Sequence, residues 1–358
     1  MWKKLKEAEP ISKSLLWRLF PFLFLSAIIN CFPNSKSKGL SKYWITQIFL
    51  YKQSEMTPSL YGGKSMSVWL WETTNILNTN DSINDSVILN VNQLIQFCEQ
   101  KQITSIYLQI NRDIPFVQYR YLVNRLSQQI LYKNGSPYTI SVQALDGAPN
   151  WVVLEGETRK NAFWQWVINY QNSSNEKEKF SGIHLDVEPH TGALWQNNEA
   201  DGVLAYQNFI NDFKSRIDES NNDYSLNMDL AVDIPFWYDS IEYNNIYGQG
   251  NLAEWVYEQI PMVTIMAYRD SVTELNEGVF GVAKKELMFG KKFNRQTIIG
   301  LETSEQIPNY ISFFEEGEIK MLEVINGTVK VIDQDIDTKN SKYSFAIHDY
   351  ENWKSLTK

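Results

Sequence analysis

The chain has 358 residues, of which 43% are hydrophobic and 14% aromatic, enough to fill the core of one large domain or two ordinary ones. Its formal net charge of −9, together with the absence of a basic stripe in the sequence, argues against nucleic acid as the partner. Cys31 and Cys98 are the only cysteines, so neither a disulfide framework nor a cysteine-based metal site is expected.

The N-terminal stretch differs in kind from the rest of the chain. Several lysines precede an apolar run from about Leu19 to Ile29, which is too short to span a bilayer comfortably but is typical of a signal-peptide core. We expect residues 1–32 to be a signal peptide or membrane anchor and residues 33–64 a spacer. This predicts export to the cell envelope or beyond. Cys31 stands where a lipoprotein carries its acylated cysteine, so membrane attachment by lipidation remains open.

From Ser65 onward, short apolar, β-branched and aromatic runs alternate with helical patterns such as Phe116–Ile130 and Val203–Phe213. Eight strand–helix units fit into residues 65–358, which is the size and rhythm of a (β/α)8 barrel. A doubly wound sheet is the rival, but no glycine-rich phosphate loop follows an early strand. The expected strands are Ser67–Thr73, Ile103–Ile110, Tyr138–Leu145, Gly182–Glu188, Ser225–Val232, Val263–Tyr268, Thr297–Leu301 and Tyr343–His348.

The fourth expected strand carries an unusual amount of charge. Its alternation points His184, Asp186 and Glu188 to one face and the apolar residues between them to the other. A strand covered on both faces ordinarily carries almost no charge. Carboxyl groups two residues apart lie roughly 7 Å from each other on one face, so each raises the pKa of the other and one can stay protonated as an acid. A plain ion-paired strand end is the alternative interpretation.

Polar and aromatic residues follow the other expected strands, where active sites of such barrels form. They predict an acidic, aromatic-rich cleft in which flat rings stack on sugar faces. They are Trp71, Asp146, Trp151, Trp195, Asp229, Asp233, Trp237, Tyr268, Asp270, Glu302, His348 and Trp353.

The run Ser181-Gly-Ile-His-Leu-Asp-Val-Glu188 resembles the DxxDxDxE strand of family 18 glycoside hydrolases, which are chitinase-like barrels. Met266-Ala-Tyr268 resembles the Met-x-Tyr of that family, and Trp353 parallels an aromatic residue after its eighth strand. The resemblance implies that Glu188 is the general acid. It also implies that Asp186 and Tyr268 hold the acetamido group of the substrate, whose carbonyl attacks the sugar.

The sequence departs from the pattern of that family in three places. Ser181 and His184 replace the first two aspartates of the motif, and Arg269 stands where an aspartate usually follows Met-x-Tyr. The third strand offers Ala144-Leu-Asp-Gly147 in place of Ser-x-Gly-Gly. Glu188 and Asp186 are both present, so the resemblance still implies hydrolysis. The residues around them differ from those of the family.

Glycoside cleavage needs a carboxylic acid beside the leaving oxygen and a negative group near the developing cation. We therefore expect Glu188, Asp186 and Tyr268 to be catalytic. We expect the substrate-binding residues to be His184, Asp146, Trp71, Trp237, Asp270, Glu302 and Trp353. If the substrate lacks an acetamido group, another carboxylate has to act as nucleophile or base, from among Asp146, Asp229, Asp233, Asp270 and Glu302.

Two other functions remain open at this point. His184, Asp186 and Glu188 could instead bind a divalent metal in a hydrolase or deacetylase. A carbohydrate-binding barrel without activity is the other possibility, and the presence of Glu188 favours an enzyme over it. We expect a monomer with a carbohydrate partner, without cofactor or bound metal.

Overall fold

The computed structural model describes residues 60–133, 136–273 and 278–357. The expected signal peptide or anchor, its Cys31 and most of the expected spacer lie outside these residues. Within the three described ranges, no helix combines the length and the apolar character that a bilayer-spanning segment requires.

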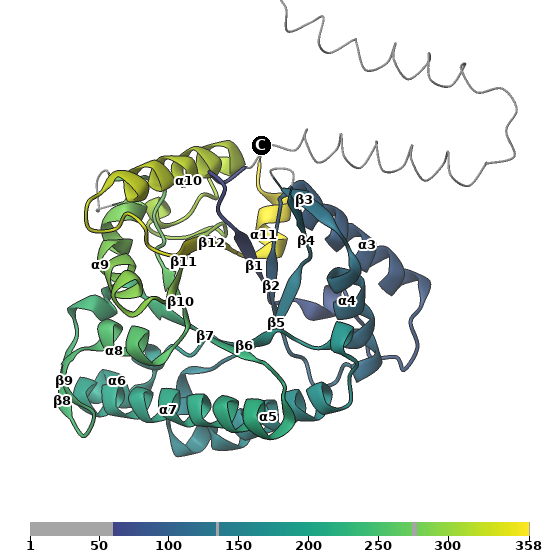
Figure 1. Cartoon of the computed structure of the whole chain (residues 1–358), viewed down its shortest axis with the longest axis horizontal. Coiled ribbons are helices and arrows are strands. Elements are labelled where there is room, and N and C mark those ends of the chain that lie inside the picture. The colour runs from purple at the N-terminus through teal and green to yellow at the C-terminus, as the bar shows by residue number, and fades with distance from the viewer. Residues whose placement is uncertain (1–59, 134–135, 274–277, 358) are drawn as a thin grey trace, which may run out of the picture. The chain divides into compact units, whose positions relative to one another are not determined.

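Eight parallel strands close into a barrel, which confirms the predicted (β/α)8 class (Figure 1). Going round the barrel, the strands follow one another in chain order, with the last paired to the first. They are β1 (Met66–Leu70), β2 (Ser105–Gln109), β5 (Ser141–Asp146), β6 (Gly182–Leu185), β7 (Asp229–Pro235), β10 (Met262–Met266), β11 (Gln296–Glu302) and β12 (Tyr343–His348). Two short hairpins, β3 (Leu131–Lys133) with β4 (Ser136–Tyr138) and β8 (Glu242–Asn245) with β9 (Gly248–Asn251), are separate from it.

Helices surround the strands on the outside of the barrel (Figure 1). They are α3 (Asp85–Gln100), α4 (Phe116–Gln128), α5 (Glu157–Asn172), α6 (Ala193–Asn197), α7 (Glu199–Tyr224), α8 (Leu252–Gln259), α9 (Gly278–Phe293), α10 (Gly317–Gln334) and α11 (Tyr350–Ser355). Asn84 and Asn198 cap α3 and α7 by accepting hydrogen bonds from backbone N–H groups of the first turn.

Each of the eight strands was expected close to its observed position, with differences at the ends. The largest lies at β7, which was expected from Ser225 but begins at Asp229. The long helix α7 continues to Tyr224, and Ser225 and Asn227 then take positive φ angles of 54° and 52°. A strand cannot begin in that left-handed region, so β7 starts later than its apolar pattern suggests.

The barrel has an outer and an inner core because successive side chains of a strand point to opposite faces. Ile183, Leu185 and Val187 belong to the outer cluster, between strands and helices, as expected. The inner cluster is made by side chains from five strands, among them Trp69 and Tyr107. His184 packs against both of these rings, 6.0 Å from Trp69 and 3.8 Å from Tyr107 between ring centroids. The polar face of β6 therefore points into the barrel, as the alternation predicted.

Candidate active site

Asp186 and Glu188 leave the barrel at the C-terminal end of β6. The strand ladder ends at Leu185, earlier than expected, and the backbone N–H of Asp186 still donates to the carbonyl oxygen of Asp146 at 3.3 Å. Glu188 directly precedes a 3-10 helix at Pro189–Thr191. Pro189 has no N–H to donate and occupies the first position of that 3-10 helix, so the chain does not return to the strand ladder there. Both carboxyl groups thus stand at the end of the barrel where its active sites form.

The carboxyl group of Asp186 is unusual in its surroundings. Its Oδ1 atom is fully buried and has no hydrogen-bond partner within the described part of the chain. Burial, followed by the charges of Asp233 and Glu188, raises the pKa of Asp186 well above its ordinary value, against a smaller opposite effect of His348. Since a buried polar atom without a partner costs about 1–3 kcal/mol, this oxygen is suited to meet a polar group of a ligand.

The carboxyl group of Glu188 is half-buried beside Asp186. Burial is the main cause that raises its pKa, and the charge of Asp233 adds to it, while His348 lowers it. A glutamic acid with a raised pKa keeps its proton at a pH where an exposed one has lost it. Glu188 therefore has the electrostatic property that a general acid needs.

Asp233 and His184 form a pair beneath these two residues, with exposed fractions of only 2% and 0%. Nε2 of His184 lies 2.5 Å from Oδ1 of Asp233, and Nδ1 lies 3.2 Å from Oε1 of Gln143. The indole Nε1–H of Trp69 donates to Oδ2 of Asp233 at 3.1 Å. Both oxygens of Asp233 and both nitrogens of His184 are thus engaged by neighbouring side chains.

A second group closes the site from β11, β12 and the end of β1. Oε2 of Glu302 lies 2.9 Å from Nδ1 of His348, and the indole Nε1–H of Trp71 donates to Nε2 of His348 at 3.0 Å. Oε1 of Glu302 accepts hydrogen bonds from Ser304 and from the N–H of Thr303. Burial opposes the charge of Glu302, but His348 and Ser304 together outweigh it and lower the pKa of Glu302.

Tyr268, just after β10, connects the two groups. Burial raises the pKa of its hydroxyl well above the ordinary value, and the charges of Glu302, Asp186, Asp233 and Glu188 add to this effect. Its ring centroid lies 6.3 Å from that of His348. The hydroxyl therefore stays protonated among carboxylates and can donate a hydrogen bond. The structure brings together seven residues from five strands or their ends, with His348 of a sixth strand beside them. The seven are Trp71, His184, Asp186, Glu188, Asp233, Tyr268 and Glu302.

Other residues expected in the site lie elsewhere or face other partners. Oδ1 of Asp146 accepts the N–H of Gly147, and burial raises its pKa despite that bond and two nearby arginines. The charge of Asp270 contributes to the raised pKa of Glu316. The backbone N–H of Asp270 donates to the carbonyl oxygen of Tyr310. Trp353 is only 2% exposed, packs against Phe97 and donates to Glu318. Its contacts are those of a core residue, because the aromatic residue after the last strand falls on the inner face of α11.

Trp237 stands on a different part of the rim, after β7. Its ring is partly exposed and meets the ring of His190 edge to face, with centroids 4.9 Å apart. Burial lowers the pKa of His190 to about 4, so this ring is neutral near pH 7. Nδ1 of His190 lies 3.2 Å from the Tyr238 hydroxyl. Trp237 and His190 thus form an uncharged pair of aromatic rings, and His190 is two residues from Glu188 in the chain.

The expected site left out several residues that the structure places in it. Asp233 had been considered only as an alternative nucleophile or base and His348 only as a residue of the cleft, and Trp69, Tyr107 and Gln143 were missed. Asp233 carried a usable signal, since it is a charged residue that follows the apolar run 230–232 within β7. Trp69 and Tyr107 gave none, because large inward-facing aromatic residues look the same whether they fill a barrel or support a site. Gln143 is a polar residue within a mostly apolar strand and gave a weaker signal of the kind that Asp233 gave.

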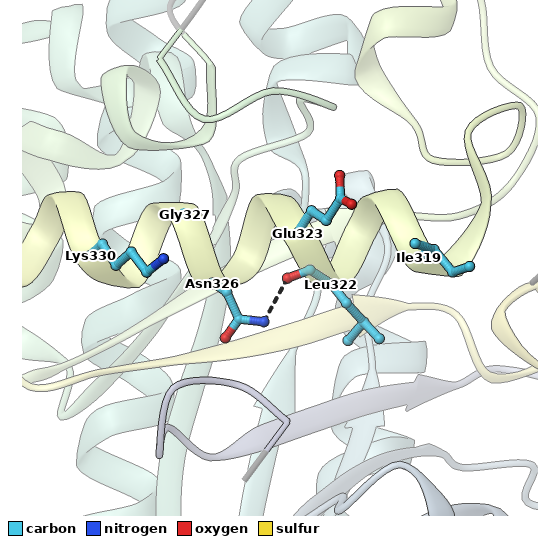
Figure 2. Close-up of a pocket in the computed structure, with 6 residues that line it drawn as sticks. All are labelled: Ile319, Leu322, Glu323, Asn326, Gly327 and Lys330. Carbon is cyan, nitrogen blue, oxygen red and sulfur yellow. Dashed lines mark hydrogen bonds between the residues drawn. The ribbon is translucent and has the colours of Figure 1, made fainter. Parts of the chain in front are cut away.

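The described residues of the site show no arrangement suited to a metal ion. No group of three or more histidine, cysteine or acidic side chains is positioned to hold one in the ranges that the structure covers. The alternative that used His184, Asp186 and Glu188 as ligands also conflicts with the two engaged ring nitrogens of His184. A pocket of about 440 Å³ lies on the outer face of α10, lined by residues such as Ile319, Asn326 and Lys330. Figure 2 shows that it shares no residue with the site.

The fold and site define a parallel barrel with a cluster of carboxyl groups at the C-terminal end of its strands. No family model and no curated protein matches the sequence. Among solved structures, the chain is similar to a plant class V chitinase mutant from Cycas revoluta, with 10% identity, 67% of this chain and 68% of that chain covered, and a TM-score of 0.40.

Two further similar structures are the spore cortex-lytic enzyme SleL of Bacillus cereus and a family 5 glycoside hydrolase from Prevotella bryantii. The first has 12% identity, covers 81% of this chain and 73% of its own, and has a TM-score of 0.39. The second has 9% identity, covers 83% and 92%, and has a TM-score of 0.43. At such identities a likeness concerns the fold, so the function has to be argued from the site.

Proposed function

We propose that this chain is a glycosidase that cleaves a glycosidic bond in a poly- or oligosaccharide, with Glu188 as the general acid. The observation that supports this most is the pair Asp186 and Glu188 at the end of β6, both with a raised pKa and both beside Tyr268. Glu188 would donate its proton to the leaving oxygen, while the other groups bind and orient the sugar.

The hydrogen bonds of the other carboxyl groups indicate which group can act as the nucleophile when the glycosidic bond breaks. Asp233 is bonded at both oxygens, and Glu302 meets Ser304, Thr303 and His348. Burial raises the pKa of Asp186 and so disfavours its anionic form. A retaining glycosidase needs an anionic nucleophile, and none of these three groups is suited to be one. We therefore propose a substrate that supplies its own nucleophile, as an acetamido carbonyl does, with Asp186 and Tyr268 orienting it.

The test is the change Glu188→Gln, assayed on a panel of oligosaccharides that includes N-acetylglucosamine oligomers and oligomers without acetamido groups. Glutamine keeps the shape but has no carboxyl proton, so turnover should fall at least about a hundredfold while binding persists. The exposed Glu323 on α10 provides the control, and Glu323→Gln should leave turnover unchanged. Hydrolysis that survives Glu188→Gln overturns the proposal.

Two results would favour the other functions. Sugar binding without turnover by the wild-type protein would identify a carbohydrate-binding barrel. Activity that is lost with a chelator and restored by a divalent ion would identify a metal-dependent hydrolase.

We also propose that the protein is exported, with attachment to the membrane through its N-terminus, on the basis of the lysines and the apolar run before Cys31. Fractionation of cells that make the full chain tests this. Recovery of the full-length protein in the cytoplasm would contradict export, and labelling with a palmitate analogue that persists in Cys31→Ser would contradict lipidation at this cysteine.

A further inference from the structure

The pair of His184 and Asp233 has an unusual position for two ionisable residues. Both side chains are almost completely buried inside the barrel, and their charges have no access to solvent. The ring of Tyr107 is stacked on His184 at 3.8 Å, and Trp69 meets it edge to face. Burial of an uncompensated charge is far more costly than burial of a compensated pair. The number of protons that the pair holds is therefore important for the whole site.

The hydrogen bonds around the pair indicate that number. The Trp69 N–H donates to Oδ2 of Asp233, so this oxygen acts as an acceptor, the role of an unprotonated carboxyl oxygen. The amide oxygen of Gln143 faces Nδ1 of His184, and an oxygen can only accept, so Nδ1 carries a proton. The remaining contact, Nε2 to Oδ1 at 2.5 Å, needs one proton between its two atoms. The pair then holds two protons in total and has no net charge.

We propose that His184 is a positioning residue of the proposed reaction: with this second proton it orients Asp233 and cancels its charge beneath Asp186. The part that concerns the reaction rests on the proposed glycosidase function, whereas the proton count does not. With Gln143 turned the other way, its NH2 group would donate to Nδ1, and the pair would carry one negative charge. The two arrangements differ by one proton, which is what the experiments have to detect.

The pair acts on a defined set of neighbours. Asp186 and Glu188 follow β6, Tyr268 follows β10, His348 ends β12 and Tyr206 lies on α7. The charge of Asp233 raises the pKa of Asp186, Glu188, Tyr268 and Tyr206, in each case after the effect of burial or alongside other charges. A proton on the His184–Asp233 contact reduces this effect. Loss of that proton would push the acid groups of the site toward a permanently protonated state.

The first experiment observes the proton directly, by nitrogen and proton NMR of the protein with labelled histidine. The chain has only three histidines, and His190→Gln and His348→Gln assign the signals of the other two. We expect two nitrogen-bound protons on the His184 ring near pH 7, the Nε2 one strongly shifted downfield, or a single ring proton on Nδ1 with the other proton on Asp233. A ring with its only proton on Nε2 would overturn the proposal. This measurement requires no substrate and stands even if the chain proves to have no glycosidase activity.

The second experiment uses the pH dependence of the site in single and double variants. His184→Gln leaves the charge of Asp233 uncancelled and should move the basic limb of the pH–rate profile upward by about one unit or more. Asp233→Asn removes the charge together with the proton that cancels it, and should move the limb by less than about half a unit. The double variant His184→Gln/Asp233→Asn has an uncharged, hydrogen-bonded pair and should return the limb to its wild-type position.

The negatively charged arrangement predicts the reverse, and these outcomes would overturn the proposal. His184→Gln would then leave the limb in place, and Asp233→Asn would move it downward. A purely structural role of His184 would lower the activity of every variant without moving the limb. Where activity is too low to measure, carbon NMR of the Glu188 carboxyl group follows the same shift. If His184→Gln does not fold, Asp233→Asn and the double variant still distinguish the two arrangements.

Discussion

Trp71 and His348 are joined by a hydrogen bond in which the indole Nε1–H donates to Nε2 of the imidazole at 3.0 Å. Nε2 can accept only while it carries no proton. Burial lowers the pKa of His348, but the contact with Glu302 and the charges of Asp349 and Asp186 outweigh this and raise it above the ordinary 6.5. The proton that His348 takes up as the pH falls therefore has to displace Trp71.

This relationship predicts a change in Trp71 near neutral pH. Tryptophan fluorescence should titrate with a midpoint above 6.5, because the indole loses its acceptor when His348 is protonated. The fluorescence change should be absent in Trp71→Phe, which lacks the indole. It should also be absent in His348→Gln, because glutamine does not titrate near neutral pH. The same midpoint in Trp71→Phe would show that another tryptophan reports the change and that the bond to His348 does not respond.

A second prediction concerns Glu286, on α9, which is fully buried with no hydrogen-bond partner for either oxygen within the described chain. Burial, followed by the charge of Asp239, raises its pKa well above the ordinary 4.5. The folded protein therefore binds this proton more tightly than the unfolded chain. Stability should fall as pH rises from about 4.5 toward the raised pKa, by at most about 1.4 kcal/mol per pH unit.

The change Glu286→Gln removes this titration. Urea unfolding should show a variant that is more stable than the wild type at pH 7.5 by about 1 kcal/mol or more, with the gain reduced at pH 4.5. Glu323→Gln, at an exposed position of α10, is the control and should show no such difference. A stability difference between variant and wild type that is equal at both pH values would contradict a raised pKa of the buried Glu286 carboxyl group.

A third prediction concerns Gly147, which allows β5 and β6 to approach each other at the site. A Cβ atom at this position would lie only 1.8 Å from the backbone oxygen of Asp186. Gly147→Ala should therefore displace Asp186, lower the free energy of unfolding by more than about 2 kcal/mol and reduce turnover. At Gly192, the nearest atom to an added Cβ is 3.2 Å away. Gly192→Ala should be much milder, and equal effects of the two changes would contradict this explanation.

The fourth prediction concerns Trp237 and Trp353, which were both expected to bind the substrate. Trp353→Phe removes the bond to Glu318 and part of a buried ring, and should cost about 1–3 kcal/mol of stability without a change in KM. Trp237→Ala should change stability little and raise KM roughly fivefold, because the lost stacking is worth about 1 kcal/mol. Urea unfolding and steady-state kinetics of both variants measure this. A rise in KM for Trp353→Phe alone would reverse the two assignments.

The amino-acid sequence by itself determined the barrel and the place of the acid pair. Alternation along a strand is a local property, so the inward position of His184 and the outward position of Ile183 and Leu185 were predictable from the order of residues. The eightfold rhythm is likewise local, because each apolar run and each helical pattern lies within a short window. The end of β6 and the start of β7 were less predictable. The first precedes the 3-10 helix at Pro189, and the second depends on where α7 ends.

Only the tertiary structure decided which residues share the site. Asp233 and His184 are far apart in the chain, as are Trp71 and His348, and each pair meets because barrel closure brings distant strands together. The same closure separated residues that the sequence had grouped, and it buried Trp353 against Phe97. A pKa depends on burial and on neighbours in space. The acid character of Asp186 and Glu188 is therefore a property of the folded barrel, although both residues can be identified in the sequence.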